Sequence, residues 1–80
     1  YKSGSKNSFE VVNDNNIIFN NLKIVGNVNN IIIVKNGVII FEGLTLSENL
    51  LINKGDVVSF EIEKDTQNIN TSFYLNGKLR

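Results

Sequence analysis

Residues Asn29–Glu42 read NNIIIVKNGVIIFE, and they contain the strongest structural signal in the chain. Two runs of β-branched residues are separated there only by Asn36-Gly37. Both central residues of a two-residue type I′ turn need a positive φ angle, which Asn and Gly tolerate best, and the twist of that turn matches the twist of the strands it joins. The stretch therefore predicts a β-hairpin.

A two-residue loop also predicts which residues face one another across the hairpin. Lys35 faces Val38, and the pairs expected beyond them are Val34/Ile39, Ile33/Ile40, Ile32/Phe41 and Ile31/Glu42. Because side chains alternate between the two sides of a strand, one face then carries Ile32, Val34, Ile39 and Phe41, and the other carries Ile31, Ile33, Val38 and Ile40. Both faces are apolar, whereas a strand with one side in water alternates apolar with polar residues.

An apolar hairpin face that is turned away from the core has two explanations. Either a neighbouring loop or strand covers it, or it forms an interface with another subunit or another domain. Under the second explanation, the expected interface residues are Ile31, Ile33, Val38 and Ile40.

Short apolar runs separated by turn-forming residues continue over the rest of the chain. Further strands are expected at Phe9–Val12, Ile17–Phe19, Leu22–Val25, Leu44–Leu46, Leu50–Ile52, Val57–Glu63 and Thr71–Leu75. Asn20-Asn21 is expected to form a bulge or a tight turn, and Asn76-Gly77 a second turn. No segment has apolar residues at helical spacing, so about seven or eight short strands predict an all-β fold: a small antiparallel β-sandwich or, as the alternative, a small β-barrel.

The direction of the side chains follows from the same alternation. In Val57–Glu63 we expect Val58, Phe60 and Ile62 to point inward, and Ser59, Glu61 and Glu63 to point to water. Elsewhere the alternation directs Leu22, Ile24, Phe73 and Leu75 inward and Lys23 and Tyr74 outward. Asp56 is expected to cap the turn Asn53–Asp56 through the backbone.

The predicted domain is a single unit of residues 9–80, and residues 1–8, rich in Lys, Ser and Gly, are expected to form a linker. Tyr1–Ser8 has neither the apolar centre of a signal peptide nor an initiator Met, so we expect the chain to be a piece of a longer protein. No apolar run approaches the length of about 18 residues that a membrane span needs.

Several kinds of chemistry lack the residues they require. The chain has no His and no Cys, which excludes disulfides, thiolate or imidazole zinc sites and the common nucleophile-base pairs. Glu61 and Glu63 form a carboxylate pair, but they lie on a strand face that is expected to be solvated, without the cleft that a glycosidase needs. We therefore predict no catalytic residues, no enzymatic activity and no cofactor.

Two polar loops contain oxygen ligands of the kind that Ca²⁺ accepts. Asn13–Asn16 and Asp65–Asn70 each contain only one Asp, whereas calcium sites use six to eight oxygens, usually with more than one carboxylate. Both loops are expected to be ordinary turns, so no metal site is predicted.

The charge balance bears on the partners. Eight basic and eight acidic residues cancel, which argues against nucleic acid and an anionic membrane as partners. The composition, with 15 Asn against a single Gln, Gln67, resembles that of proteins from low-GC bacteria and their phages.

The Asn-Gly hairpin, the Asn53–Asp56 turn and the amphipathic strand Val57–Glu63 together resemble small β-sandwich modules of Gram-positive bacterial surface proteins, phage tail proteins and cell-wall-lytic proteins. The resemblance covers Ile31–Leu75 and rests on turn and strand signals. It implies a binding or spacer unit of a larger extracellular, cell-surface or virion protein, and it transfers no site residues.

An exposed aromatic ring flanked by hydrogen-bonding groups is the usual device for carbohydrate binding. Trp is absent, and Tyr74 and Tyr1 are the candidates, of which Tyr74 is expected either to contact a ligand or to pack under a loop or against a neighbour. Our leading hypothesis is a non-catalytic module that recognises cell-wall or other surface carbohydrate, with Tyr74 as the binding residue, or that presents another domain which does so. The alternative is an assembly unit of a phage tail, fibre or surface protein, which packs against copies of itself or neighbouring domains.

Overall fold

Seven β-strands and no helix make up the part of the chain that the computed structural model describes, residues 8–64 and 72–80. The strands are β1 (Ser8–Val12), β2 (Ile17–Val25), β3 (Val28–Lys35), β4 (Val38–Gly43), β5 (Leu50–Ile52), β6 (Val57–Lys64) and β7 (Ser72–Leu79). Strand β1 therefore begins one residue before the domain boundary expected from the sequence.

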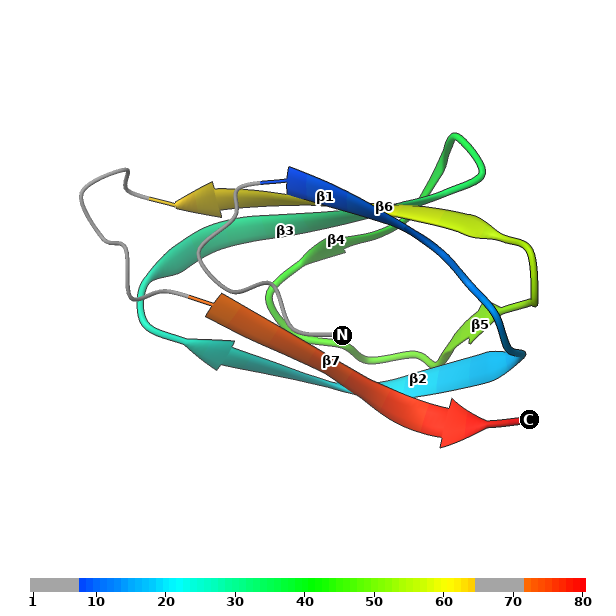
Figure 1. The fold of residues 1–80 in the computed structure, drawn as a ribbon. Coiled ribbons are helices and arrows are strands. Elements are labelled where there is room, and N and C mark those ends of the chain that lie inside the picture. The colour runs from blue at the N-terminus through cyan, green and yellow to red at the C-terminus, as the bar shows by residue number, and fades with distance from the viewer. Residues whose placement is uncertain (1–7, 65–71) are drawn as a thin grey trace.

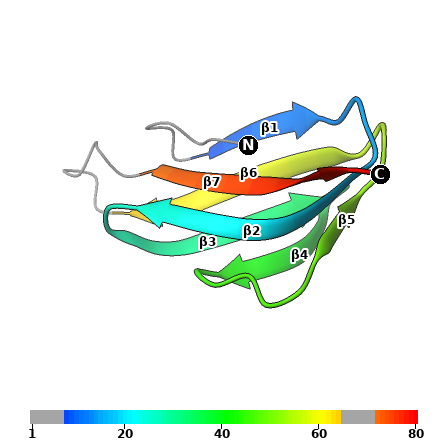
Figure 2. The same cartoon turned by 90° about the horizontal axis from the view of Figure 1, so that it is seen from below.

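The strands form two antiparallel sheets that pack face to face (Figure 1). One sheet has the order β1-β6-β3-β4 and the other the order β5-β2-β7. The chain crosses from one sheet to the other between β1 and β2 and again between β2 and β3. Figure 2 shows β1 and β7 on one side of the molecule, with β4 and β5 on the opposite side. This arrangement confirms the predicted all-β sandwich.

The core lies between the two sheets and contains the inward residues of each strand. Phe60 and Phe73, from opposite sheets, are both fully buried, and their ring centroids lie 5.5 Å apart. Phe9, on the edge strand β1, stacks on Phe60 with a distance of 4.7 Å between the ring centroids. The core comprises Phe19, Val28, Ile31, Ile33, Leu50, Ile52, Val58, Phe60, Ile62, Phe73 and Leu75, which confirms the inward positions expected in β6 and β7.

The Asn-Gly turn of the predicted hairpin is confirmed. Asn36 and Gly37 join β3 to β4 with φ angles of 51° and 84°, so both central residues have the positive φ that this turn requires. Lys35 pairs with Val38, and Val34 with Ile39, as expected.

Beyond these two pairs, the expected register of the hairpin is wrong. The pairing shifts between Ile33 and Val34, and Ile33 lies opposite Phe41 instead of Ile40. The remaining pairs are Ile32 with Glu42 and Ile31 with Gly43. Ile40 is the additional residue of a β-bulge, which puts two residues of one strand against one residue of its partner. The bulge brings Phe41 to the side of Ile33, where it packs against the core.

The structure separates the four residues expected at an interface. Ile31 and Ile33 are 0% and 1% exposed, because β3 is an interior strand whose inward side packs against the second sheet. Ile40 is partly buried against the core, and only Val38, 63% exposed, lies at the surface. The outward residues of the hairpin are instead Ile32, Val34 and Ile39, which pair with outward residues of the neighbouring strands. An interface on the hairpin stays a prediction, with a different set of residues.

Two other expected strand boundaries are wrong. Ile17–Phe19 and Leu22–Val25 belong to one continuous strand, β2. Its register against β7 shifts between Phe19 and Asn21, so the bulge predicted at Asn20-Asn21 is confirmed and the alternative, a tight turn, is wrong. Leu44–Leu46 is a loop, and its Leu46 packs against the core without joining a sheet.

The second Asn-Gly pair is not a turn. Asn76 and Gly77 lie inside β7, which continues to Leu79 along β2. A Cβ atom built on Gly77 would lie 2.8 Å from the carbonyl carbon of Ile18 and 2.8 Å from the Cα of Phe19, both backbone atoms. Glycine is therefore required here because β2 and β7 approach closely beside the β2 bulge. Thr71, expected in this strand, lies outside the described residues.

The turns at one end of the sandwich are joined through Asp56. Its Oδ1 accepts a hydrogen bond from the Asn36 side-chain amide at 2.9 Å, and its Oδ2 accepts one from the Asn53 backbone N–H at 2.8 Å. The Asn13 N–H donates to the Asp56 carbonyl at 3.0 Å. Asp56 thus caps its own turn, as expected, and also holds the hairpin turn of β3 and β4. The Asn53 N–H and, next, the Asn36 amide lower the pKa of the Asp56 carboxyl, because both stabilise the carboxylate.

This network predicts a specific acid sensitivity. The pKa of Asp56 is lower in the folded chain than its value of about 3.9 in an unfolded chain, so the carboxylate stabilises the fold fully above about pH 5. That stabilisation starts to decline near pH 4 and is lost as the pH falls through the lower pKa of the folded chain. The difference in Tm between the wild type and Asp56→Asn is therefore expected to shrink between pH 6 and pH 2. Asn36→Gly keeps a residue that tolerates the turn, and it removes the amide donor to Asp56 together with the acceptor of the Val57 N–H. Because the Asn53 N–H still bonds Asp56, the pH dependence of its Tm should be intermediate. A difference that is constant with pH would contradict this role of Asp56.

Candidate functional site

The outer surface of the β5-β2-β7 sheet brings the predicted site residue Tyr74 together with polar side chains from two strands. Tyr74 pairs with Lys23, and Asn76 pairs with Asn21 one step along the sheet. Residues that pair directly point to the same side, and the intervening pairs Leu22/Leu75 and Ile24/Phe73 face the core. We call this outward surface the three-stranded face, and it consists of Ile18, Asn21, Lys23, Val25, Leu51, Tyr74, Asn76 and Lys78.

Tyr74 lies half-buried on this face. The ammonium nitrogen of Lys23 lies 6.0 Å from the centroid of the Tyr74 ring, at the outer limit of a cation–π contact. The side chains before and after Tyr74, Phe73 and Leu75, are both buried, which confirms the predicted alternation of inward and outward residues in β7.

An amide pair lies next to the ring. The Asn76 side-chain amide donates to the Asn21 side-chain oxygen at 3.3 Å, and both residues are exposed. A side-chain amide has two N–H donors and one carbonyl acceptor, and this bond uses neither the Asn21 donors nor the Asn76 acceptor. Hydroxyl groups of a ligand need both kinds of partner.

The three-stranded face has charge of one sign. Lys23 and Lys78 are both exposed, and the described residues of β2, β5 and β7 include no Asp or Glu. Apolar residues lie at its two ends, with Leu51 50% and Val25 38% exposed.

The outer surface of the β1-β6-β3-β4 sheet, which we call the four-stranded face, has the opposite sign. Its outward rows are Glu10/Ser59/Val34/Ile39 and Ser8/Glu61/Ile32/Glu42, with Glu63 beside Asn30 beyond them. Among the side chains described on this face there are four carboxylates and no Lys or Arg. Although the net charge of the chain is zero, the outer faces of the two sheets therefore carry opposite charges.

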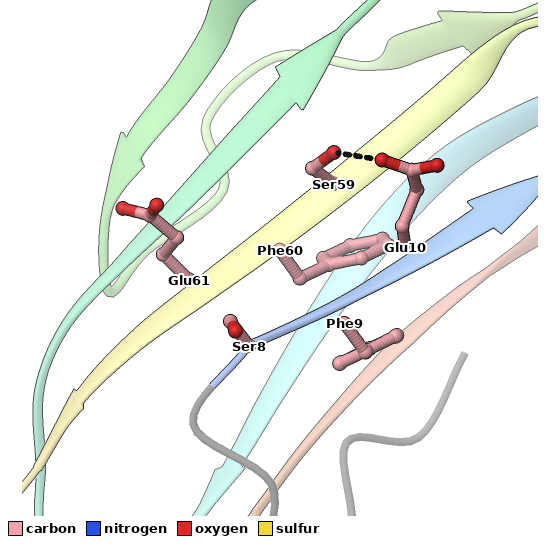
Figure 3. A pocket seen from close by; sticks show the side chains of 6 residues that line it. All are labelled: Ser8, Phe9, Glu10, Ser59, Phe60 and Glu61. Carbon is pink, nitrogen blue, oxygen red and sulfur yellow. Dashed lines mark hydrogen bonds between the residues drawn. The ribbon is translucent and has the colours of Figure 1, made fainter.

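A shallow pocket of about 250 Å³ opens between β1 and β6 on this side of the molecule (Figure 3). Its lining consists of Ser8, Phe9, Glu10, Ser59, Phe60 and Glu61. The Ser59 hydroxyl donates to Glu10 at 3.4 Å, and Figure 3 shows Glu61 pointing away from that pair. The pocket is smaller than the range of about 300 to 1,000 Å³ that is typical of ligand sites.

The other residues considered for a site are the Glu61/Glu63 pair, the polar loops and Tyr1. Glu61 and Glu63 are exposed on the four-stranded face, as expected. No group of three or more His, Cys, Asp or Glu side chains that could hold a metal ion occurs among the described residues, and the loop Asp65–Asn70 lies outside them. Tyr1 also lies outside them. Within residues 8–64 and 72–80, no helix is long and apolar enough to cross a membrane.

Comparisons with protein-family models, with curated protein sequences and with solved structures gave no match. The candidate site therefore rests on the geometry of this chain. The sequence predicted Tyr74 but not Lys23, Lys78, Asn21 or Asn76 as its neighbours. Alternation showed that Lys23 points outward, but only the pairing of β2 with β7, about 50 residues apart in the chain, brings it beside Tyr74.

Proposed function

We propose that this chain is a non-catalytic binding module of a larger extracellular or phage-associated protein, and that it recognises cell-wall or other surface carbohydrate on the three-stranded face. The observation that supports the proposal most directly is the position of Tyr74 beside Lys23 and the Asn21–Asn76 amide pair. The resemblance to small β-sandwich modules of bacterial surface and phage proteins supports a location at a cell surface or on a virion.

The physical argument concerns the chemistry of a sugar. A pyranose ring has an apolar side that packs on an aromatic ring, and its hydroxyl groups need donors and acceptors at the edge of that contact. Neighbouring strands lie about 4.8 Å apart, and residues two apart on one strand lie about 7 Å apart. Tyr74, Lys23, Asn21 and Asn76 thus occupy an area comparable with one or two sugar units. A flat sheet surface accommodates an extended chain of such units.

Tyr74→Ala is expected to weaken binding to Gram-positive cells or purified cell walls by at least about tenfold, because it removes the only described aromatic ring on the three-stranded face. The measurement is co-sedimentation of the labelled domain, with free wall polysaccharide as competitor. Tyr74→Phe, which keeps the ring, should retain most of the binding.

A matched control is Ile39→Ala, an exposed residue on the four-stranded face, which should bind like the wild type. The melting temperature of each variant must stay near that of the wild type for the comparison to count. Saturable binding that is unchanged in Tyr74→Ala would refute the site, and an absence of binding by the wild type would refute the function.

A second candidate function is the assembly unit. It is favoured by Val38 and Ile39, which are 63% and 58% exposed at the hairpin of β3 and β4. Apolar side chains gathered at a surface often mark a contact with another chain. An assembly unit should form oligomers in light scattering, whereas a binding module needs no self-association.

A further inference from the structure

We infer that the carbohydrate bound by the three-stranded face is a polyanion, a polysaccharide that carries phosphate or carboxylate groups along its length. The inference rests on the proposed function, because it assigns the chemical class of the ligand to the same face. It starts from the separation of charge between the two faces of the sandwich.

The three-stranded face presents Lys23 and Lys78 without any carboxylate among its described residues, while Glu10, Glu42, Glu61 and Glu63 are on the four-stranded face. A face that only had to bind neutral sugars would gain nothing from this sorting, since neutral hydroxyls donate to carboxylates at least as strongly as to amides. An anionic polymer, in contrast, is attracted by the lysines and would be repelled by any carboxylate beside them.

The acidic face does not cancel this attraction. The two sheets are separated by about 10 Å, and the outward side chains lie further apart still. That distance exceeds the Debye length of about 8 Å at physiological ionic strength. The potential next to the three-stranded face is therefore dominated by its own lysines, and the carboxylates help to orient the molecule with this face toward an anionic surface.

The positions of the two lysines match an elongated ligand. Lys23 lies beside Tyr74, and Lys78 lies four residues further along β7, which is roughly 13 Å along the strand direction. The Asn21–Asn76 pair lies between them. A polymer that follows β7 would thus meet a cation, a ring, two amides and a second cation in sequence.

Single-stranded nucleic acid is the other polyanion to consider. Proteins that bind it combine a basic groove with several aromatic side chains on which successive bases stack. The three-stranded face has one aromatic ring and two lysines among its described residues, with amides between them. This composition favours a polymer rich in hydroxyl groups.

The experiment compares Gram-positive walls in three forms: untreated, stripped of phosphodiester polymers by hydrofluoric acid, and amidated at their carboxyl groups. Binding of the wild-type domain should fall about tenfold or more on one of the two treated forms, which identifies phosphate or carboxylate as the recognised group. Lys23→Gln and Lys78→Gln should each weaken binding to untreated walls several-fold, and raising the salt concentration should weaken the wild type more than either variant. Lys54→Gln removes an equal charge from an exposed turn outside the face and should bind like the wild type.

The outcomes separate the two proposals. Binding that depends on Tyr74 but is unaffected by both wall treatments, by salt and by the two lysine variants would overturn the polyanion and leave carbohydrate recognition in place. A complete lack of wall binding would overturn both. Tighter binding to a single-stranded oligonucleotide or to anionic lipid vesicles than to untreated walls would overturn the polysaccharide as the ligand.

Discussion

Gly77→Ala is expected to destabilise the domain by about 3 kcal/mol or more, which corresponds to a fall in Tm of more than about 10 °C for a chain of this size. A methyl group at position 77 would lie 2.8 Å from both the Ile18 carbonyl carbon and the Phe19 Cα. Backbone atoms inside a paired sheet cannot move aside as the end of a flexible side chain can, so β2 and β7 would have to separate locally. Thermal unfolding followed by circular dichroism measures the effect.

Lys78→Ala is the control for this substitution, because Lys78 is the next residue of β7 and its side chain is exposed. A surface change of this kind usually alters the free energy of unfolding by less than about 0.5 kcal/mol. If Gly77→Ala melts within a few degrees of the wild type, the close approach of β2 and β7 is not present in solution.

Ile33→Ala should cost about 2 to 5 kcal/mol of stability, the range observed when a buried isoleucine is truncated and the space is incompletely refilled. Ile33 is 1% exposed, and it lies on β3 between Phe60 of β6 and Phe41 of β4. Small domains have total stabilities of about 5 to 15 kcal/mol, so a loss of this size leaves a substantial unfolded population at moderate temperature. Chemical denaturation gives the change directly.

Ile39→Ala provides the matched comparison, because it is the same substitution on the same hairpin at a residue that is 58% exposed. Its unfolding free energy should stay within about 0.5 kcal/mol of the wild type. Equal losses in the two variants would contradict the burial of Ile33 and the exposure of Ile39. Light scattering on Ile39→Ala also tests the assembly unit: if the wild type forms oligomers and this variant does not, the exposed hairpin is an interface.

The two Asn-Gly pairs show where local sequence is sufficient and where it is not. Asn36-Gly37 joins two strands that pair directly with each other across a two-residue loop, and the dipeptide's tolerance of positive φ is used. Asn76-Gly77 has the same tolerance, but β2 is available alongside it, and extending the strand gains ladder hydrogen bonds with β2. The deciding partner, Phe19 of β2, is nearly 60 residues away, so no short window of sequence around position 77 contains it.

Tyr74 illustrates the same limit for the candidate site. Alternation with Phe73 and Leu75 is enough to direct its ring outward, because the period of a strand is two. Its neighbours depend on which strand lies beside β7 and on the shift of register at the β2 bulge. The formal charge of zero, likewise, constrains the chain as a whole and says nothing about how the folded sheets distribute lysines and glutamates.

The amino-acid sequence alone therefore determined the all-β class, the hairpin turn at Asn36-Gly37, the inward residues of β6 and β7, and the outward direction of Tyr74. All of these follow from local φ preferences and from a period of two, which act within a few residues. Only the tertiary structure decided between the bulge and the tight turn at Asn20-Asn21, and it alone decided the bulge at Ile40, the burial of Ile31 and Ile33, the continuation of β7 through Gly77, and the opposite charges of the two faces. These features depend on which strands become neighbours, because the free energy of burying apolar side chains between two sheets outweighs the local preference of any single turn or pair.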